Sequence, residues 1–126
     1  QISDPPAPVV LVEIRSPASP TEPNPERLIA LIDSGADGSV IPQTLIDSLN
    51  LCKVDEIMVR SYNDKEEDSK LQPVYSVHLT IPPLKPVLAE VTPKDSRNYA
   101  IIGRDIINDW LLTLDGPKLK STIKTT

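Results

Sequence analysis

Short apolar segments recur along the chain, and proline-rich or polar stretches separate them. The clearest pattern lies in Tyr75–Ile81, where apolar and polar side chains alternate at every position. Such alternation is typical of a half-buried β-strand, because successive side chains point to opposite faces of a sheet. Further extended segments are predicted at Pro8–Arg15, Arg27–Ile32, Ser39–Ile41, Glu56–Tyr62, Val87–Val91, Tyr99–Ile102, Leu112–Leu114 and Lys118–Ile123.

Two segments show helical spacing instead. Pro42 is suited to the first position of a helix, and the apolar residues that follow it up to Leu49 lie on one helical face. A second helix is predicted over Arg104–Leu111, where apolar residues again recur at helical intervals. Many short strands with only two short helices favour a closed or sandwiched all-β domain.

The polar and proline-rich segments define the expected domain. Asn63–Lys70 contains no apolar residue and lies between two predicted strands, so it should form the tip of a long hairpin that projects into solvent. Proline accounts for 14 of 126 residues, about twice the usual fraction, which fits the turns and edges of β-structure. We expect residues 1–8 to be a flexible, proline-rich lead-in and residues 9–126 to form one folded domain.

The stretch Leu28–Pro42 carries the candidate chemistry. Five apolar residues, Leu28–Ile32, lead directly into Asp33-Ser34-Gly35. A run this short and this apolar indicates a fully buried strand. A carboxylate at the end of such a strand is costly unless it is paired or hydrogen-bonded, and Gly35 gives the backbone freedom to turn just past it. We therefore expect Asp33 to be a fixed carboxyl group on a tight loop.

A later segment has a similar arrangement. Ala100–Ile102 is apolar and leads into Gly103, after which the second helix is predicted. This weak repetition is the pattern expected of two related halves that meet at one site. One acid alone rarely performs acid–base chemistry, so Asp33 should need a partner carboxylate.

Composition excludes several classes of function. Charged residues make up 25% of the chain and the net charge is -5. Binding to nucleic acid is not expected, because phosphate neutralisation needs clustered Lys and Arg. The longest apolar run, Leu28–Ile32, is far too short to span a bilayer, so no membrane association is expected.

The single cysteine limits the chain further. Cys52 cannot form an internal disulfide, and we expect it to be a small buried hydrophobic residue. One Cys and one His cannot make a metal cluster of the usual kinds. The cysteine usage slightly favours a reducing compartment, so a cytoplasmic or other intracellular location is expected, unless a targeting segment was removed before Gln1.

Three motifs resemble those of the retropepsins, the single-domain aspartic proteases of retroviruses, retrotransposons and their cellular and bacterial relatives. They are Asp33-Ser34-Gly35-Ala36-Asp37, Val40-Ile41-Pro42 and Ile101-Ile102-Gly103-Arg104-Asp105. An Asp-Ser-Gly triplet alone most often marks a turn or a helix start, but the later motif and its separation also fit. The resemblance covers roughly Val9 to Ile123 and implies a closed, barrel-like all-β fold with a long flap hairpin.

The resemblance also implies an activity. A retropepsin subunit supplies one catalytic aspartate, and a homodimer brings it against its own copy, which fits a chain with one Asp-Ser-Gly. The expected function is that of an aspartic endopeptidase acting on polypeptides. Asp33 of one subunit would activate a water, while Asp33 of the other would polarise the scissile carbonyl. No metal or organic cofactor is needed.

Further roles follow from the same resemblance. Ser34 would hold the two active-site loops together across the dimer, and Gly35 would offer its carbonyl to the substrate backbone. The predicted substrate-binding residues are Ala36, Asp37, Val40 and Ile101, and their apolar members indicate a preference for apolar side chains flanking the cut. Arg104 would pair with Asp37, although both could instead be solvated surface charges.

The chain departs from the viral pattern in two places. Viral flaps are rich in glycine, whereas the predicted flap tip, Tyr62–Lys70, has none and is strongly charged. Lys118–Ile123 extends beyond the single terminal strand of the shortest viral enzymes, so the dimer interface could be built differently. The alternative interpretation is a non-catalytic peptide-binding or dimerisation module that has kept the fold.

Overall fold

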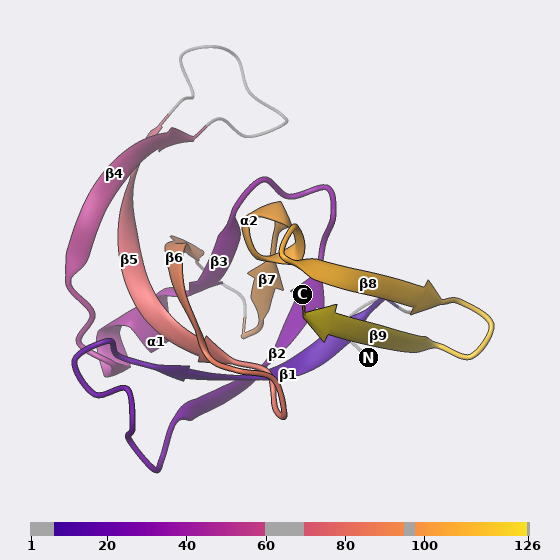
Figure 1. Cartoon of the computed structure of the whole chain (residues 1–126). Coiled ribbons are helices and arrows are strands. Elements are labelled where there is room, and N and C mark those ends of the chain that lie inside the picture. Colours follow the sequence, from indigo (N-terminus) through magenta and orange to yellow (C-terminus); the bar gives the residue numbers. More distant parts are fainter. Residues whose placement is uncertain (1–6, 60–69, 95–97, 126) are drawn as a thin grey trace.

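The computed structural model describes residues 7–59, 70–94 and 98–125 of the chain. Strands dominate the described residues, and two short helices accompany them (Figure 1). In chain order the elements are β1 (Val9–Arg15), β2 (Glu26–Ile32), β3 (Ser39–Pro42), α1 (Gln43–Ser48), β4 (Lys53–Val59), β5 (Lys70–Thr80), β6 (Val87–Lys94), β7 (Ala100–Ile102), α2 (Arg104–Ile107), β8 (Trp110–Asp115) and β9 (Lys120–Thr125).

Six of the strands close into a barrel. Hydrogen bonding runs in the order β1-β2-β7-β3-β6-β5, and β5 returns to pair with β1. The closing register places Ile14 opposite Leu79, with the two strands antiparallel. Closure leaves these strands without an open sheet edge. The prediction of a closed all-β fold with one or two short helices is confirmed.

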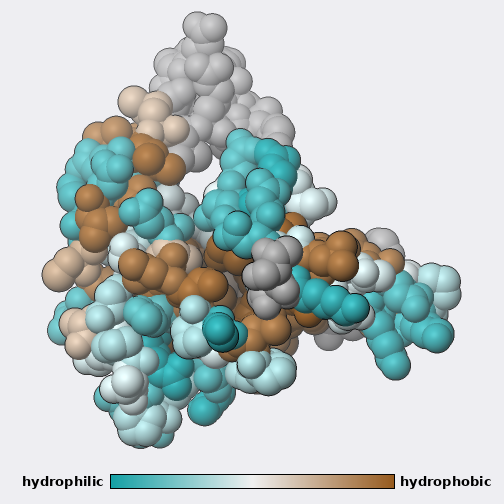
Figure 2. Space-filling view, viewed as in Figure 1, coloured by the Kyte–Doolittle hydropathy of each residue, from teal (hydrophilic) through white to brown (hydrophobic). Residues whose placement is uncertain are grey.

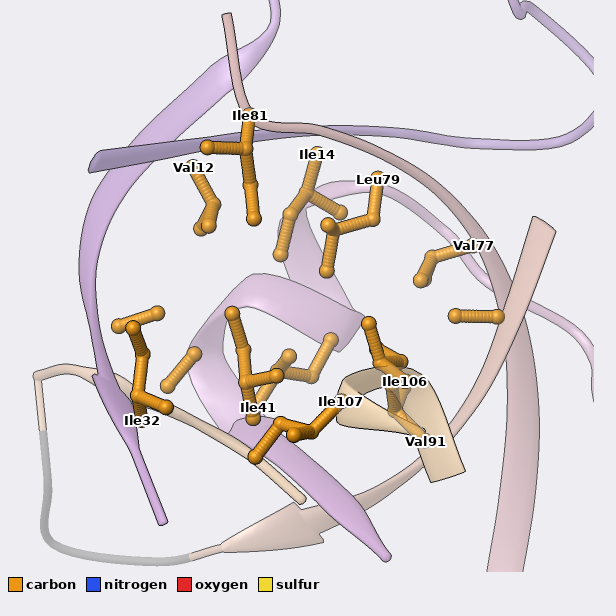
Figure 3. Packing of buried hydrophobic residues seen from close by; sticks show 14 of the residues in the cluster. Val12, Ile14, Ile32, Ile41, Val77, Leu79, Ile81, Val91, Ile106 and Ile107 are labelled. Atoms are coloured by element: carbon orange, nitrogen blue, oxygen red, sulfur yellow. The ribbon is translucent and has the colours of Figure 1, made fainter. Parts of the chain in front are cut away.

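The fully buried side chains inside the barrel are all aliphatic, and Tyr75 and Trp110 pack against them from partly buried positions. Val12 and Ile14 of β1 and Val77 of β5 have no exposed surface. Figure 3 shows side chains from β1 and β5 facing Ile41 of β3 and Ile107 of α2 across the interior. The alternation seen in the sequence therefore sends every second side chain inward.

The relation between β2 and β7 positions the loops that follow them. These two strands are neighbours and run parallel, with Ile32 opposite Ile102. β3 pairs with the other side of β7, antiparallel, through Val40 and Ile101. Since parallel strands end at the same edge, the loops after β2 and β7 leave the barrel side by side.

The second predicted helix is too long. α2 ends at Ile107, and the residues from Trp110 onward form β8, which pairs with β9. Ile106 and Ile107 are buried by the helix, whereas Trp110 reaches the core from a strand. A helical turn followed by a strand can bury residues at the same intervals as a longer helix, and this produced the wrong boundary.

β8 and β9 form a two-stranded ribbon that projects from the barrel (Figure 1). A turn over residues 116–119 joins them, where Lys118 donates its amide to Asp115 Oδ1 over 3.2 Å. The ribbon therefore adds two paired strands to the end of the chain.

Two smaller predictions were also wrong. Cys52 is exposed, because it directly precedes β4, the strand at the open edge of the sheet. β6 continues to Lys94, beyond the predicted end of this strand at Val91, because its end pairs in parallel with β3.

The predicted hairpin is present as far as it is described. β4 pairs antiparallel with β5, beginning at Lys53 rather than at residue 56. Together they form a curved arm that carries exposed apolar side chains, among them Ile57, Met58 and Leu71 (Figures 1 and 2). The predicted flap tip lies almost wholly outside the described residues, as does most of the predicted lead-in. None of the helices within the described ranges has the length and apolar character needed to cross a membrane.

The closed core gives a direct test of the fold. Replacing Ile14, which is fully buried, by Ala should lower the free energy of unfolding by about 2–5 kcal/mol, because a cavity forms in the barrel. Leu11→Ala on the same strand, where the side chain is 53% exposed, should cost less than about 1 kcal/mol. Urea denaturation measures both, and equal losses would contradict the described orientation of β1.

Candidate active site

Asp33 lies directly after β2 and is held in place by two hydrogen bonds. Its amide donates to the carbonyl of Ile102 over 2.9 Å, which extends the parallel pairing of β2 with β7 by one residue. Its Oδ1 accepts the amide of Gly35, also at 2.9 Å. The side chain is half-buried. As expected, Asp33 is a fixed carboxyl group at the end of a strand. The prediction that this strand is fully buried is wrong: Ala30 and Ile32 face the core, whereas Ile29 points outward and is 47% exposed.

Gly35 contributes in a different way from the one predicted. No described glycine has a positive φ, so the loop does not use the conformational freedom expected of Gly35. A Cβ atom at this position would instead lie 3.1 Å from Asp33 Oδ1, closer than most Cβ contacts. The absence of a side chain thus leaves room for the Asp33 carboxylate to accept the amide of Gly35.

Arg104 binds the Asp33 loop (residues 33–38) at three positions. Its amide donates to the carbonyl of Ala36 over 2.8 Å, and its Nη1 donates to the carbonyl of Ser34 over 3.0 Å. Its Nη2 forms an ion pair with Asp37 Oδ1. The Asp37 side chain is 90% exposed, so the ion pair alone contributes little to stability. The two hydrogen bonds from Arg104 to the backbone carbonyls of Ser34 and Ala36 hold the loop in place.

Gly103 is the point of closest approach between the two loops. It is buried, and an added Cβ would lie 2.6 Å from the Gly38 carbonyl oxygen and 2.8 Å from that of Ala36. Both atoms belong to the backbone, so neither can move aside cheaply. The turn after β7 can therefore contact the Asp33 loop only with glycine at this position.

A cavity of about 760 Å³ opens beside Asp33. This volume is within the usual range for ligand sites in proteins. The predicted residues that line it are Asp33, Gly35, Ala36, Asp37, Val40 and Ile101. Ile57 and Met58 of β4 and Val74 of β5 form an apolar part of the wall, and Glu90, Thr92 and Lys94 of β6 add polar groups. Ser34 and Arg104 are exposed and lie outside this lining.

Ser39 and Asp105, for which no role was predicted, connect the two loops from within. Ser39 is 3% exposed and is the buried polar residue of the described chain. Its hydroxyl donates to Asp105 Oδ1 over 2.8 Å. The sequence contains two signals for them. Ser39 is a polar residue at the start of an apolar strand, and Asp105 is an acid shortly after Gly103. Only the fold shows that these two residues meet.

Among the described residues, no group of three or more His, Cys, Asp or Glu side chains is arranged to hold a metal ion. Two acids of the cavity besides Asp33 have partners of their own: Asp37 pairs with Arg104, and Asp105 binds Ser39. The site therefore offers a carboxylate beside a partly apolar cavity.

Comparison with known proteins identifies the fold that carries this site. No protein-family model matches the chain, and no curated protein matches its sequence. Among solved structures, the solution structure of simian foamy virus (mac) protease matches with a TM-score of 0.56 and 18% sequence identity, over 79% of this chain and 91% of the viral one. EIAV protease in complex with the inhibitor HBY-793 matches with a TM-score of 0.54 and 20% identity, over 82% and 86%. The chain has the retroviral protease fold.

The match concerns the retroviral protease fold and not the chemistry, because both identities are low. It supports the resemblance drawn from the three sequence motifs. The roles assigned to Asp33, Ser34 and the cavity residues remain predictions.

The close approach at Gly103 can be tested with a matched pair of variants. Gly103→Ala should destabilise the protein by about 1–3 kcal/mol, since the new methyl group overlaps two carbonyl oxygens of the Asp33 loop. Gly38→Ala places a methyl group where no atom lies within 4 Å, so its stability should stay within about 1 kcal/mol of the wild type. Urea denaturation measures the free energy of unfolding of both variants. A Gly103→Ala variant as stable as the wild type would contradict the described packing of the loops.

Proposed function

We propose that the protein is an aspartic endopeptidase that acts as a homodimer. The observation that carries the proposal is the placement of Asp33, held by the Ile102 carbonyl and the Gly35 amide beside the large cavity. The retroviral protease fold supports the same interpretation, because both matched structures are proteases. A second copy of the chain would supply the second carboxylate of the site.

A two-fold axis next to Asp33 would make the dimer contact self-complementary. Two carboxylates about 3 Å apart do not both ionise readily, so the pair would share one proton and titrate as a unit. Ser34 is exposed and follows Asp33 directly, and its hydroxyl is proposed to bind the partner's loop. Arg104 would keep each loop in position for this contact through the Ser34 carbonyl.

The proposed reaction is hydrolysis of a peptide bond by water. The ionised Asp33 takes a proton from the water as it attacks the carbonyl carbon, and the protonated Asp33 gives its proton to the carbonyl oxygen. When the C–N bond breaks, the leaving nitrogen receives the proton that the first carboxylate took from the water, and the other carboxylate takes a proton back from a hydroxyl of the tetrahedral intermediate. The products are a carboxylic acid and an amine, and the pair again holds one proton. No external oxidant, reductant or metal enters this balance.

The substrate is proposed to be an extended polypeptide with apolar side chains flanking the cut. Ala36, Val40 and Ile101 line the cavity next to Asp33, and β4 and β5 add further apolar surface from Ile57 and Val74. Burial of apolar side chains there would favour binding by about 25 cal/mol for each Å² covered.

Asp33→Asn should abolish peptide cleavage and leave the fold intact. The amide can neither accept the water proton nor share one, but its oxygen can still accept the Gly35 amide. The matched control is Asp47→Asn on α1, an exposed position that should keep full activity. Cleavage of oxidised insulin B chain, followed by mass spectrometry at several pH values, measures both variants. Undiminished cleavage by Asp33→Asn would overturn the mechanism.

The same assay also separates an enzyme from a binding module. A transition-state-analogue peptide should inhibit cleavage by the wild type in proportion to the active sites occupied. A wild-type protein that binds this peptide but cleaves nothing at any pH would identify a non-catalytic module with the same fold.

Dilution should lower the activity of each chain. If the site needs two copies, specific activity falls once the protein concentration drops below the dissociation constant of the dimer. Sedimentation velocity over the same concentrations should show dimers giving way to monomers in step with this loss. A specific activity that does not change with concentration would show that the site is complete within one chain.

A further inference from the structure

We propose that Asp105 is a positioning residue, which acts through Ser39 to hold the Asp33 loop against the turn after β7. This inference rests on the proposed function, because it assigns Asp105 a part in presenting Asp33 to the partner's Asp33. Nothing in the sequence pattern or in the fold match gives Asp105 such a part.

The contact between Ser39 and Asp105 uses the hydroxyl and the amide of Ser39 and both carboxylate oxygens of Asp105. The Ser39 hydroxyl donates to Asp105 Oδ1 over 2.8 Å and accepts the amide of Gly103 over 3.0 Å. The Ser39 amide donates to Asp105 Oδ2 over 3.3 Å. Asp105 Oδ1 also accepts the amide of Ile106 at 3.0 Å, within α2. Both carboxylate oxygens are thus occupied.

This contact attaches the end of the Asp33 loop to the turn after β7, in addition to the contacts that Arg104 makes with Ser34 and Asp37. Asp33 is attached at the start of the loop through the Ile102 carbonyl, and Ala36 is attached in the middle through the Arg104 amide. Ser39 is attached at the end, through Asp105 and Gly103. Hydrogen bonds to a charged acceptor are about twice as strong as neutral ones, and the Ser39 side chain is buried.

Loss of this attachment should affect turnover more than substrate binding. The carbonyl oxygens of Ala36 and Gly38 lie 2.8 Å and 2.6 Å from the position that a Cβ of Gly103 would occupy, so the loop packs directly against this turn. Release of Ser39 would remove the hydrogen bonds that hold the end of the loop in this packing. A displacement of about 1 Å at a reacting group can cost about a hundredfold in rate. Ala36 and Asp37 would move with the loop, but the apolar cavity walls on β4 and β5 and Ile101 on β7 would stay where they are, so KM should change less than kcat.

The experiment compares Asp105→Ala, Ser39→Ala and the double variant in the full chain. Each single variant should lower kcat by about tenfold to a hundredfold, with KM within about twofold of the wild type. The double variant should be no slower than the slower single variant, because both remove the same attachment. Ser39→Thr keeps the hydroxyl and should restore most of the activity.

Two controls distinguish positioning from loss of stability. Asp109→Ala removes another exposed acid shortly after α2, with no bond to the Asp33 loop, and should leave kcat unchanged. Ile14→Val weakens the barrel core away from the loops by about 1 kcal/mol and should also leave kcat unchanged at temperatures where the protein stays folded. Additive losses in the double variant, or an equal loss of kcat in Ile14→Val, would overturn the proposal.

A readout independent of cleavage separates this proposal from the proposed function. The ¹H–¹⁵N resonance of Gly35 reports on the Asp33 carboxylate, because the Gly35 amide donates to it. That resonance should shift in Asp105→Ala and Ser39→Ala and stay in place in Asp109→Ala. If the wild type cleaves nothing, the proposed function fails, while a shifted Gly35 resonance still supports positioning by Asp105. An unmoved Gly35 resonance overturns the positioning role whatever the activity.

Discussion

The parallel pairing of β2 with β7 is the contact on which the candidate site depends. It brings the Asp33 loop and the turn after β7 to one edge of the barrel, and the bond from the Asp33 amide to the Ile102 carbonyl continues it into the site. Gly103 then allows the two loops to touch. A rigid barrel with an aliphatic core supports this edge, so the position of one carboxylate is fixed by residues far apart in the sequence.

Much of this arrangement was predictable because it follows from local patterns. The alternation around Val77 gave β5, and the apolar run before Asp33 gave β2 and the fixed carboxylate at its end. The second apolar run, which ends at Ile102, indicated a related half, and it forms the strand that runs parallel to β2. Burial with a period of two is visible in a sequence, since it depends only on which side chains face the core.

Features that depend on contacts distant in the sequence were missed or wrong. Ser39 and Asp105 are separated by more than sixty residues, and neither has a local pattern that announces a hydrogen bond. Trp110 has helical spacing but belongs to β8, because pairing with β9 determines its conformation. Gly35 was expected to provide a turn and instead leaves room for the Asp33 carboxylate. In each case tertiary contacts overrode a sound local expectation.

The central claim is that one chain holds half of a catalytic site. Mixing wild-type protein with an equal amount of Asp33→Asn, after exchange of subunits, tests it most directly. If each site needs Asp33 from both chains, only about one random pair in four keeps both, so activity at constant total protein should fall to about a quarter of the wild-type value. A fall to about half would show that every wild-type chain works alone, and would contradict the shared site.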